Sequence, residues 1–326
     1  MTKGRNITFD IMKGIGILLV MTCHFFGWNH HWLSNTINSF HMPMFFIVAG
    51  FFSKSFVDKA TSKSCIKKYF NRLFWPFCFT QVLIVLWCVI MVFSQNDSWN
   101  LAVNNALSIF WADVYGPKTP WGELTIGIVW FLLALLIAKI ILIPLSRTEK
   151  WAIPISLLLA YSAILLHKIF PYSIWCIALG LTALPFVTIG WWAKSHNIPQ
   201  WIKIVIIIAW PIAILFSKVV MYDMTWQCYP LDVLGACGGT YCFYLLCDFL
   251  EHNCKLLSKI FASLGVWSLA IMCFHHFELQ SHLTNHILAL MSISFPAGIK
   301  YVFEYVFTIG MATIVVHTPK IKKIFV

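Results

Sequence analysis

Charge is what this sequence has little of. Asp, Glu, Lys and Arg together make up 11% of its 326 residues, whereas a soluble domain carries about 25%. Hydrophobic residues make up 60% of the chain. This balance excludes a water-soluble globule and an intrinsically disordered chain, and it predicts a protein that has lipid as its solvent.

Paired cysteines are also missing. The chain has 11 cysteines, but they are scattered, several lie inside apolar runs, and no two have CxxC or zinc-type spacing. Cysteines of this kind behave as small buried hydrophobic residues. We therefore expect neither a disulfide framework nor a cysteine-bound zinc.

Long apolar runs are what the sequence has instead. A membrane-crossing helix needs about 20 mostly apolar residues, and runs of this length exclude the alternating strands of a membrane barrel. The first run has no small-residue cleavage site, so we expect a membrane helix there and no cleaved signal peptide. The sequence predicts an all-α polytopic membrane protein with ten helices. They lie at about residues 7–27, 36–53, 73–95, 124–145, 151–168, 173–193, 201–219, 230–250, 258–280 and 297–317.

The basic residues predict the orientation of these helices. If the N-terminus is cytoplasmic, most of the 23 Lys and Arg residues fall in cytoplasmic segments, as the positive-inside rule requires. We therefore expect both termini in the cytoplasm. The net charge of +11 is then explained by topology and anionic lipid, and no basic domain is left for nucleic acid. No soluble domain is left either, so residues 1–326 are expected to form a single integral-membrane domain.

The first predicted helix carries ionisable residues, which are costly in a membrane and are functional candidates for that reason. Asp10 and Lys13 are three residues apart, so they share a helix face and can form an ion pair. His24 follows Lys13 by close to three turns, so it shares this face about 16 Å further along the axis. Gly14 and Gly16 permit close approach of another helix or a ligand. The alternative is a lysine that extends to the membrane surface and a histidine bonded to a neighbouring helix.

Two further histidines are expected at a similar depth, in the outer half of the membrane. His41 begins the second predicted helix, and His275 lies near the end of the ninth. With His24 they would surround one polar site. Metal ligation is the alternative, but the three residues come from three helices without an HxxxH or HxH pair, so no metal is predicted.

A basic run with Lys63, Lys67 and Lys68 precedes the third predicted helix on the cytoplasmic side. Such lysines usually set topology and contact lipid headgroups. Arg72 differs because it stands at the helix entrance, four residues before Pro76, where a forked guanidinium suits a phosphate.

Three charged residues of the later helices receive structural interpretations. Lys139 is expected to extend toward the cytoplasm. Glu278 and Glu304 are expected to be ordinary charges at the outer membrane interface.

Taken in order, these residues resemble the membrane acyltransferase 3 family. The resemblance covers nearly the whole chain and rests on five motifs in register. The first motif, D-x-x-[R/K]-[G/A] with a histidine eleven residues after the basic one, is matched by Asp10, Lys13, Gly14 and His24, and the second, F-H-x-P-x-F-F-x-x-[S/A]-G-F, is matched by Phe40 through Phe51. The third is matched by Tyr69, Arg72 and Pro76, and the fourth, W-F-L, by Trp130, Phe131 and Leu132. The fifth, G-x-x-S-L-x-I-x-x-x-H, is matched by Gly265, Ser268, Leu269, Ile271 and His275.

The sequence departs from the family pattern at two points. Lys13 stands where many members have arginine, which suits point-charge binding of phosphate better than bidentate binding. The glutamate of a second branch, W-[S/T]-L-x-x-E, is absent after Trp130.

The resemblance implies an enzyme that moves an acyl group, acetyl by default, from cytoplasmic acyl-CoA to a hydroxyl of a cell-envelope glycan or lipid-linked sugar. It implies His24 as general base, or as a nucleophile that accepts the acyl group. Lys13 and Arg72 would bind the CoA phosphates, with Asp10 orienting Lys13. The remaining candidates, His41, His275 and Ser268, would shape the acceptor side or stabilise the oxyanion. The implied location is a bacterial inner membrane.

Two other classes of function remain open at this point. A transporter or flippase for a lipid-linked sugar or small metabolite would also be basic, aromatic-rich and polytopic, but it would not need an acid–base stripe. A sensor or scaffold would need an output module, and none is expected here. Release of CoA thiol from acyl-CoA separates an acyltransferase from a transporter.

Overall fold

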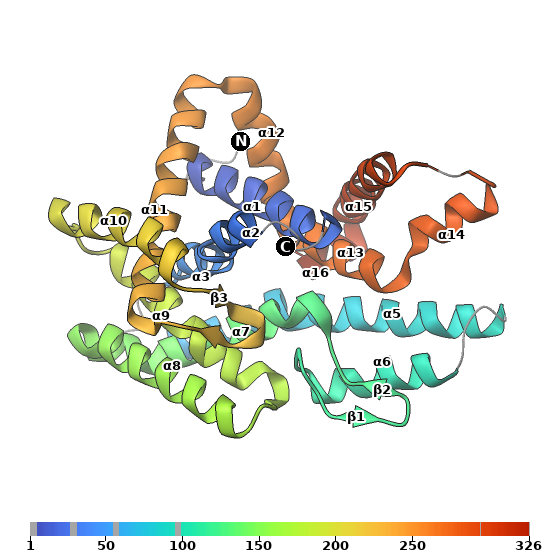
Figure 1. Cartoon of the computed structure of the whole chain (residues 1–326), viewed down its shortest axis with the longest axis horizontal. Coiled ribbons are helices and arrows are strands. Elements are labelled where there is room, and N and C mark those ends of the chain that lie inside the picture. Colours follow the sequence, from blue (N-terminus) through green and yellow to red (C-terminus); the bar gives the residue numbers. More distant parts are fainter. Residues whose placement is uncertain (1–4, 27–30, 55–58, 95–98, 294, 326) are drawn as a thin grey trace. The chain divides into compact units, whose positions relative to one another are not determined.

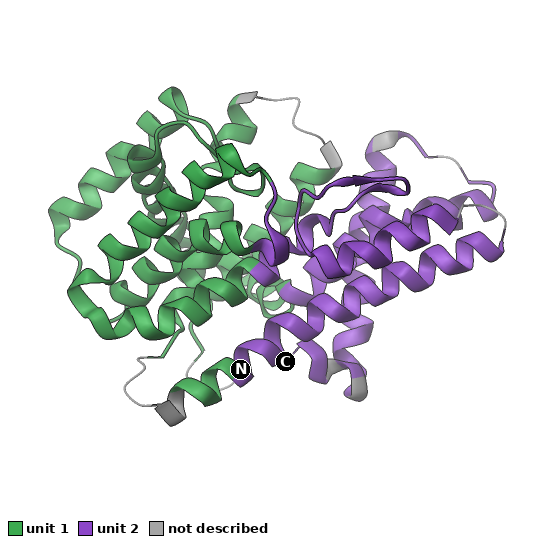
Figure 2. Cartoon of the chain, turned by 90° about the horizontal axis from the view of Figure 1, so that it is seen from below, with its two compact units in different colours: residues 1–66, 134–171, 177–268 green, residues 67–133, 172–176, 269–326 purple. Residues whose placement is uncertain are grey.

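The computed structural model describes residues 5–26, 31–54, 59–94, 99–293 and 295–325, and nearly all of its regular structure is helical (Figure 1). The chain divides into two compact units (Figure 2). Unit 1 comprises residues 1–66, 134–171 and 177–268, and unit 2 comprises residues 67–133, 172–176 and 269–326. The chain therefore passes between the units several times.

Unit 1 is a bundle of apolar helices. Its longer helices are α1 (Ile7–Phe26), α3 (His41–Phe51), α7 (Trp130–Leu145, whose first turn belongs to unit 2), α8 (Ala152–Ile169), α9 (Ile177–Ala193), α10 (Gln200–Phe216), α11 (Tyr229–Asn253) and α12 (Lys255–Val266). The short α2 (His31–Asn38) precedes α3, and α4 (Lys59–Tyr69) leads toward unit 2. Two short antiparallel strands, β3 (Val219–Val220) and β4 (Thr225–Trp226), lie in the connection between α10 and α11. In this pair Val219 lies opposite Trp226.

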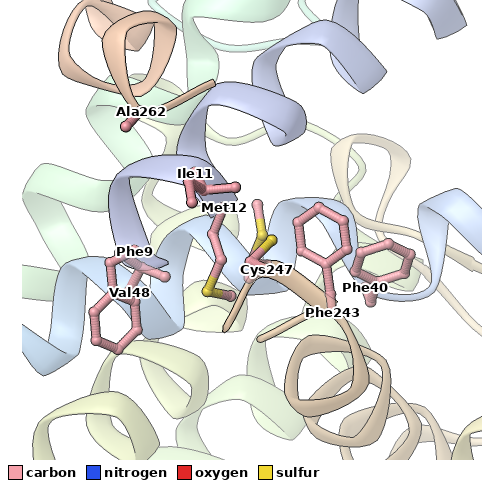
Figure 3. Close-up of a cluster of buried hydrophobic side chains, with 9 residues drawn as sticks. Phe9, Ile11, Met12, Phe40, Val48, Phe243, Cys247 and Ala262 are labelled. Atoms are coloured by element: carbon pink, nitrogen blue, oxygen red, sulfur yellow. The ribbon is translucent and has the colours of Figure 1, made fainter. Parts of the chain in front are cut away.

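The core of unit 1 forms where α1, α3 and α11 meet. Side chains from these helices, including Phe9, Met12, Met44 and Phe243, pack into one buried cluster (Figure 3). The ring centroids of Phe9 and Phe51 are 4.8 Å apart. A Cβ on Gly16 would lie 2.6 Å from the Met44 side chain. The start of α1 therefore lies beside the end of α3, and the two helices run in opposite directions.

Two reciprocal glycine pairs bring other helices of unit 1 together. A Cβ on Gly14 of α1 would lie 1.9 Å from the carbonyl oxygen of Phe261 on α12, and a Cβ on Gly265 would lie 1.8 Å from that of Asp10. In this arrangement each glycine faces the carbonyl four residues before the other, as expected for helices that run in the same direction. Small residues at such crossings let two backbones touch.

Unit 2 contains a second set of helices. They are α5 (Trp75–Phe93), α6 (Trp99–Trp111), α13 (Ser268–Ser281), α14 (Leu283–Leu290), α15 (Ala297–His317) and α16 (Pro319–Phe325). The π-helical turn η1 (Phe70–Phe74) leads into α5. A short hairpin, β1 (Lys118–Thr119) with β2 (Gly122–Glu123), follows α6. Part of the core of unit 2 is formed by Ile84, Cys88 and Ala102 of α5 and α6.

The helices agree with an all-α polytopic membrane protein. Among the described residues, six helical stretches are long and apolar enough to cross a membrane, or seven if α12 and α13 form one broken span. The first of them coincides with the first predicted span, and Gly27 and Gln95, the last residues of two predicted spans, lie outside the described residues.

The structure shows why fewer membrane-crossing stretches are found than the ten predicted spans. The spans predicted at 124–145 and 151–168 correspond to the two helices α7 and α8, which a short 3-10 segment joins into one stretch, Gly127–Ile169, with a non-helical break at Glu149, where φ is 42°. The span predicted at 36–53 contains α3, which has only 11 residues because the chain turns before it. The span predicted at 201–219 contains the 17-residue α10, and that at 258–280 is broken at Trp267 between α12 and α13.

Candidate functional site

One carboxylate holds two cations at the start of α1. Asp10 is buried, with 6% of its side chain exposed, and Lys13 Nζ lies 2.7 Å from its Oδ1. Arg5 donates from Nε to Oδ2 and from Nη2 to Oδ1, the latter over 3.3 Å. The helical i,i+3 spacing predicted the Asp10–Lys13 pair. Arg5 precedes the helix and was not foreseen as its partner. The three residues leave a surplus of one positive charge.

Helix α12 fixes the backbone of α1 at this cluster. The carbonyl oxygen of Asp10 faces Gly265 across the first glycine pair. Ser268, three residues after Gly265, donates a hydrogen bond from its hydroxyl to the Gly265 carbonyl oxygen over 3.1 Å. Ser268 is the first residue of α13 but belongs to unit 1, and it lies just beyond the point where α12 crosses α1.

The other end of α1 brings two predicted histidines together. His24 is exposed in the last turn of α1. Because α1 and α3 run in opposite directions, this turn lies beside the start of α3, where His41 is buried. The two imidazoles are within electrostatic range of each other. The Nδ1 atom of His41 lies 2.8 Å from the carbonyl oxygen of Ile37, which fixes the ring.

Arg72 lies in unit 2, inside the π-helical turn η1, and is exposed. A π-helical turn adds one residue per turn to a helix, so it changes the direction in which the following side chains point, and such turns occur frequently at functional sites. The ordinary α-helix of α5 resumes at Trp75, and Pro76 occupies its first turn.

His275 also lies in unit 2, on α13, and both it and the adjacent His276 are fully buried. The Nε2 atom of His276 lies 3.5 Å from Nε2 of Gln81, and this amide donates to the Ile126 carbonyl oxygen over 3.2 Å. His276 and Gln81 were not selected from the sequence. Their signal would have been a polar residue inside each of two apolar runs.

The prediction that Glu278 and Glu304 are ordinary interface charges is wrong. Both side chains are buried. Glu278 Oε1 accepts a hydrogen bond from the Thr284 amide over 3.0 Å, and Glu304 lies 3.9 Å from Lys300 Nζ. The short helix α14 and the approach of α15 cover these carboxylates, and neither feature is visible in the local sequence pattern.

A second group of cations in unit 1 also escaped the sequence reasoning. Lys139 of α7 and Lys194, just after α9, both reach Ser53 at the end of α3. Lys139 was expected to extend toward the cytoplasm, and the structure gives its ammonium a partner on another helix. Among the described residues, no group of three or more His, Cys, Asp or Glu side chains is placed to hold a metal ion.

The predicted site residues thus fall in both units. Asp10, Lys13, His24, His41 and Ser268 belong to unit 1, whereas Arg72 and His275 belong to unit 2. Within unit 1, α1 carries a cation cluster at one end, and its other end brings His24 beside the start of α3, where His41 lies.

Comparison with known proteins gives one match to a family model and one to a relative. The model described as an acyltransferase domain, of the acyltransferase 3 type, matches residues 6–316. The nodulation protein NolL of Mesorhizobium japonicum is similar, with 26% identity over 223 residues. This match covers 63% of the present chain and 54% of the relative, so the chain spans about half the length of that protein. No solved structure matches the chain.

Proposed function

Because the chain belongs to the membrane acyltransferase 3 family, we propose that it transfers an acyl group from cytoplasmic acyl-CoA to a hydroxyl of a cell-envelope glycan or lipid-linked sugar. Acetyl-CoA is the proposed donor. One observation carries the proposal: helix α1 joins a cation cluster anchored on Asp10 to an exposed histidine about 16 Å along the same helix.

The proposed topology gives each end of α1 its role. Ten membrane crossings with both termini in the cytoplasm would place Asp10 and Lys13 near the cytoplasmic face and His24 in the outer half. The bacterial inner membrane is the proposed location, and residues 1–326 are proposed to act as one integral-membrane domain. The nucleotide head of CoA would then bind at the cytoplasmic end of α1 while its long arm extends along the helix.

The cation cluster suits the head of CoA. Lys13 is partly exposed, with 27% of its side chain accessible, and an ammonium carries three hydrogen-bond donors. One of them is directed to Asp10, which orients the ammonium, and the others are directed toward a phosphate. Arg72 is proposed as a further phosphate ligand because a guanidinium binds two phosphate oxygens at once.

His24 is proposed as the general base. An alcohol is a poor nucleophile until a base removes its proton, and an imidazole suits this task at neutral pH. The acceptor oxygen attacks the thioester carbonyl carbon while His24 takes the hydroxyl proton. The carbon–sulfur bond of the tetrahedral intermediate then breaks, and the departing CoA thiolate takes the proton from His24.

His41 and Ser268 are proposed to bind acceptor hydroxyls. The Ile37 carbonyl can only accept, so Nδ1 of His41 carries the proton and its Nε2 is a hydrogen-bond acceptor in the neutral ring. Ser268 donates its proton to Gly265. Both residues are therefore arranged to accept hydrogen bonds, which suits sugar hydroxyls better than an oxyanion, since an oxyanion requires donors. His275 is proposed to contribute to the acceptor side.

The test is the release of CoA thiol from acetyl-CoA and succinyl-CoA by the purified protein in detergent, with CoA binding followed by thermal shift. We expect His24→Ala to abolish turnover and keep CoA binding. The exposed His252 at the end of α11 provides a matched control as His252→Ala, which should behave as wild type. Turnover by His24→Ala within a few-fold of wild type would refute the general base, and absence of binding and turnover with every acyl-CoA would refute the donor.

A further inference from the structure

The second glycine pair brings the ends of α3 and α9 together. A Cβ on Gly50 would lie 2.0 Å from the carbonyl oxygen of Val187, and a Cβ on Gly190 would lie 2.0 Å from that of Ile47. As with α1 and α12, this is a crossing of helices that run in the same direction. Ser53 follows Gly50 by three residues and Lys194 follows Gly190 by four, so the crossing places the two residues at the same end of unit 1.

Two ammonium groups converge on Ser53 at this end. Lys139 Nζ lies 3.3 Å from Ser53 Oγ, and Lys194 Nζ lies 3.3 Å from the Ser53 carbonyl oxygen. Ser53 is buried, with 2% of its surface exposed, whereas Lys194 is exposed. The cations therefore gather on one serine at the edge of the bundle, where a ligand can reach them from water.

Capping of α3 does not require these lysines. The Ser53 amide donates to Gly50 over 2.8 Å, and the Phe52 amide donates to Val48 over 3.3 Å. The Ser53 hydroxyl donates to Ala49 over 3.1 Å. The chain itself thus satisfies the Val48, Ala49 and Gly50 carbonyls in the last turn of α3, and one cation would suffice for the helix dipole. Two ammonium groups on one residue repel each other, and an anion between them removes that repulsion.

The same end of unit 1 carries the cluster on α1. The ring of Phe9 packs against Phe51 at 4.8 Å and against Phe52 at 5.3 Å. Asp10 follows Phe9, and Lys13 lies one turn further along α1. The lysines on Ser53 and the cations on Asp10 therefore occupy one end of the bundle as two separate groups. CoA carries its phosphates in two separate places, a diphosphate and a 3′-phosphate, and requires two such groups.

We propose that Lys139 and Lys194, held on Ser53, bind a phosphate group of the CoA donor. The inference rests on the proposed function. Lysine binds phosphate as a compact point charge with several donors, and the Ser53 hydroxyl directs the half-buried Lys139 by accepting one of its protons. A phosphate in an anionic lipid headgroup has the same chemistry, so the experiment compares the two sources.

The experiment measures the affinity of the full chain in detergent for CoA, dephospho-CoA and pantetheine. Lys139→Met and Lys194→Met each remove one cation and keep an apolar stem. We expect each to weaken CoA binding about tenfold, as loss of one hydrogen bond to a charged group predicts, and to leave pantetheine unchanged. Lys139→Arg, which keeps the charge, should retain most of the affinity. Lys203→Met is the matched control, because the ammonium of Lys203 lies over the Tyr241 ring of unit 1, whereas those of Lys139 and Lys194 contact Ser53.

The outcomes separate this inference from the proposed function. If wild type does not bind CoA, the donor assignment fails and the phosphate site fails with it. If wild type binds CoA and both methionine variants bind it equally well, only the site on Ser53 is refuted. It is also refuted if the variants lose only their binding to phosphatidylglycerol added to the detergent, since the site would then hold a lipid headgroup. A native-like thermal unfolding transition in each variant shows that a loss of affinity does not reflect misfolding.

Discussion

Gly14 of α1 and Gly265 of α12 face each other, and each leaves room for a carbonyl oxygen of the other helix. The carbonyl opposite Gly265 belongs to Asp10, the residue that holds Arg5 and Lys13. A contact between two backbones thus fixes the residue on which the cation cluster depends. Stability and donor binding should therefore both be sensitive to this crossing.

Gly265→Ala should lower stability markedly. The new methyl group would lie 1.8 Å from a backbone oxygen, so α12 must move away from α1. Overpacking of this kind typically costs about 1–3 kcal/mol. Thermal unfolding in detergent measures the effect. Gly310→Ala is the control, because a Cβ there meets no atom within 4 Å, and it should be neutral or slightly stabilising. Equal unfolding temperatures for the two variants would contradict the role of the glycine pair.

The ion cluster on Asp10 should act as a unit in donor binding. Asp10→Asn removes the negative charge that holds Lys13 at 2.7 Å, and Lys13→Met removes the cation itself. We expect each change to raise the KM for acyl-CoA about tenfold and the double variant to be little worse than either single one, because residues in one network are not additive. Steady-state kinetics of the four proteins measures the coupling. Strict additivity would show that Asp10 does not act through Lys13.

Asp113 should make stability depend on pH. It lies in the loop after α6, where its carboxylate accepts hydrogen bonds from the amides of Val114 and Ser173, each over 2.9 Å. Burial raises the pKa of this carboxyl from 3.8 to about 6. The folded protein therefore binds the proton more tightly than the unfolded chain. Its stabilising contribution is complete below about pH 4 and is lost as the pH rises through 6, an effect of roughly 3 kcal/mol.

Thermal unfolding between pH 4 and 7.5 tests the effect of Asp113. Asp113→Asn should show a flatter pH profile than wild type, even if loss of one acceptor oxygen lowers its stability at every pH. Glu123→Gln, at an exposed position of β2, should follow wild type. Parallel profiles for wild type and Asp113→Asn would place the pH dependence on other groups.

Gln81 should be needed for the stability of unit 2. Its amide is buried, with 1% exposed, and it donates to the Ile126 carbonyl oxygen. Gln81→Met preserves volume but leaves that carbonyl without this donor, which costs about 1–3 kcal/mol. Val82→Met alters the neighbouring residue, which is 51% exposed, and should have little effect. A Gln81→Met protein that unfolds with wild-type midpoint would show that the carbonyl finds another partner.

Local spacing explains which features could be predicted from sequence. Asp10 and Lys13 form an ion pair because both stand on one helix, where i,i+3 spacing fixes their distance. The apolar runs likewise predicted where most helices lie. The break at Trp267 was missed because it does not lower the hydropathy of the run that contains it, whereas the break at Glu149 falls in the charged segment between the spans predicted at 124–145 and 151–168.

Contacts between distant segments explain what sequence could not predict. Lys139 and Lys194 are 55 positions apart and meet at Ser53, Lys194 because α3 and α9 cross at a glycine pair and Lys139 because its side chain reaches Ser53 from α7. The burial of Glu278 depends on how α14 folds back and on α15, and Gln81 meets His276 from a helix almost 200 positions away. His24 and His41 come to the same end of α1 because α1 and α3 run in opposite directions, which the predicted topology did supply.

The buried polar residues of α13 have a consequence for the assembly of the chain in the membrane. This helix carries His275, His276 and Glu278 in close succession, all buried, and such a segment partitions poorly into lipid by itself. During synthesis it must therefore leave the translocon against helices that are already inserted. Gln81, which contacts His276, lies on α5 and is made long before α13, so the order of the chain provides this polar surface in time. Removal of α5 should then prevent insertion of α13, although the sequence of α13 itself is unchanged.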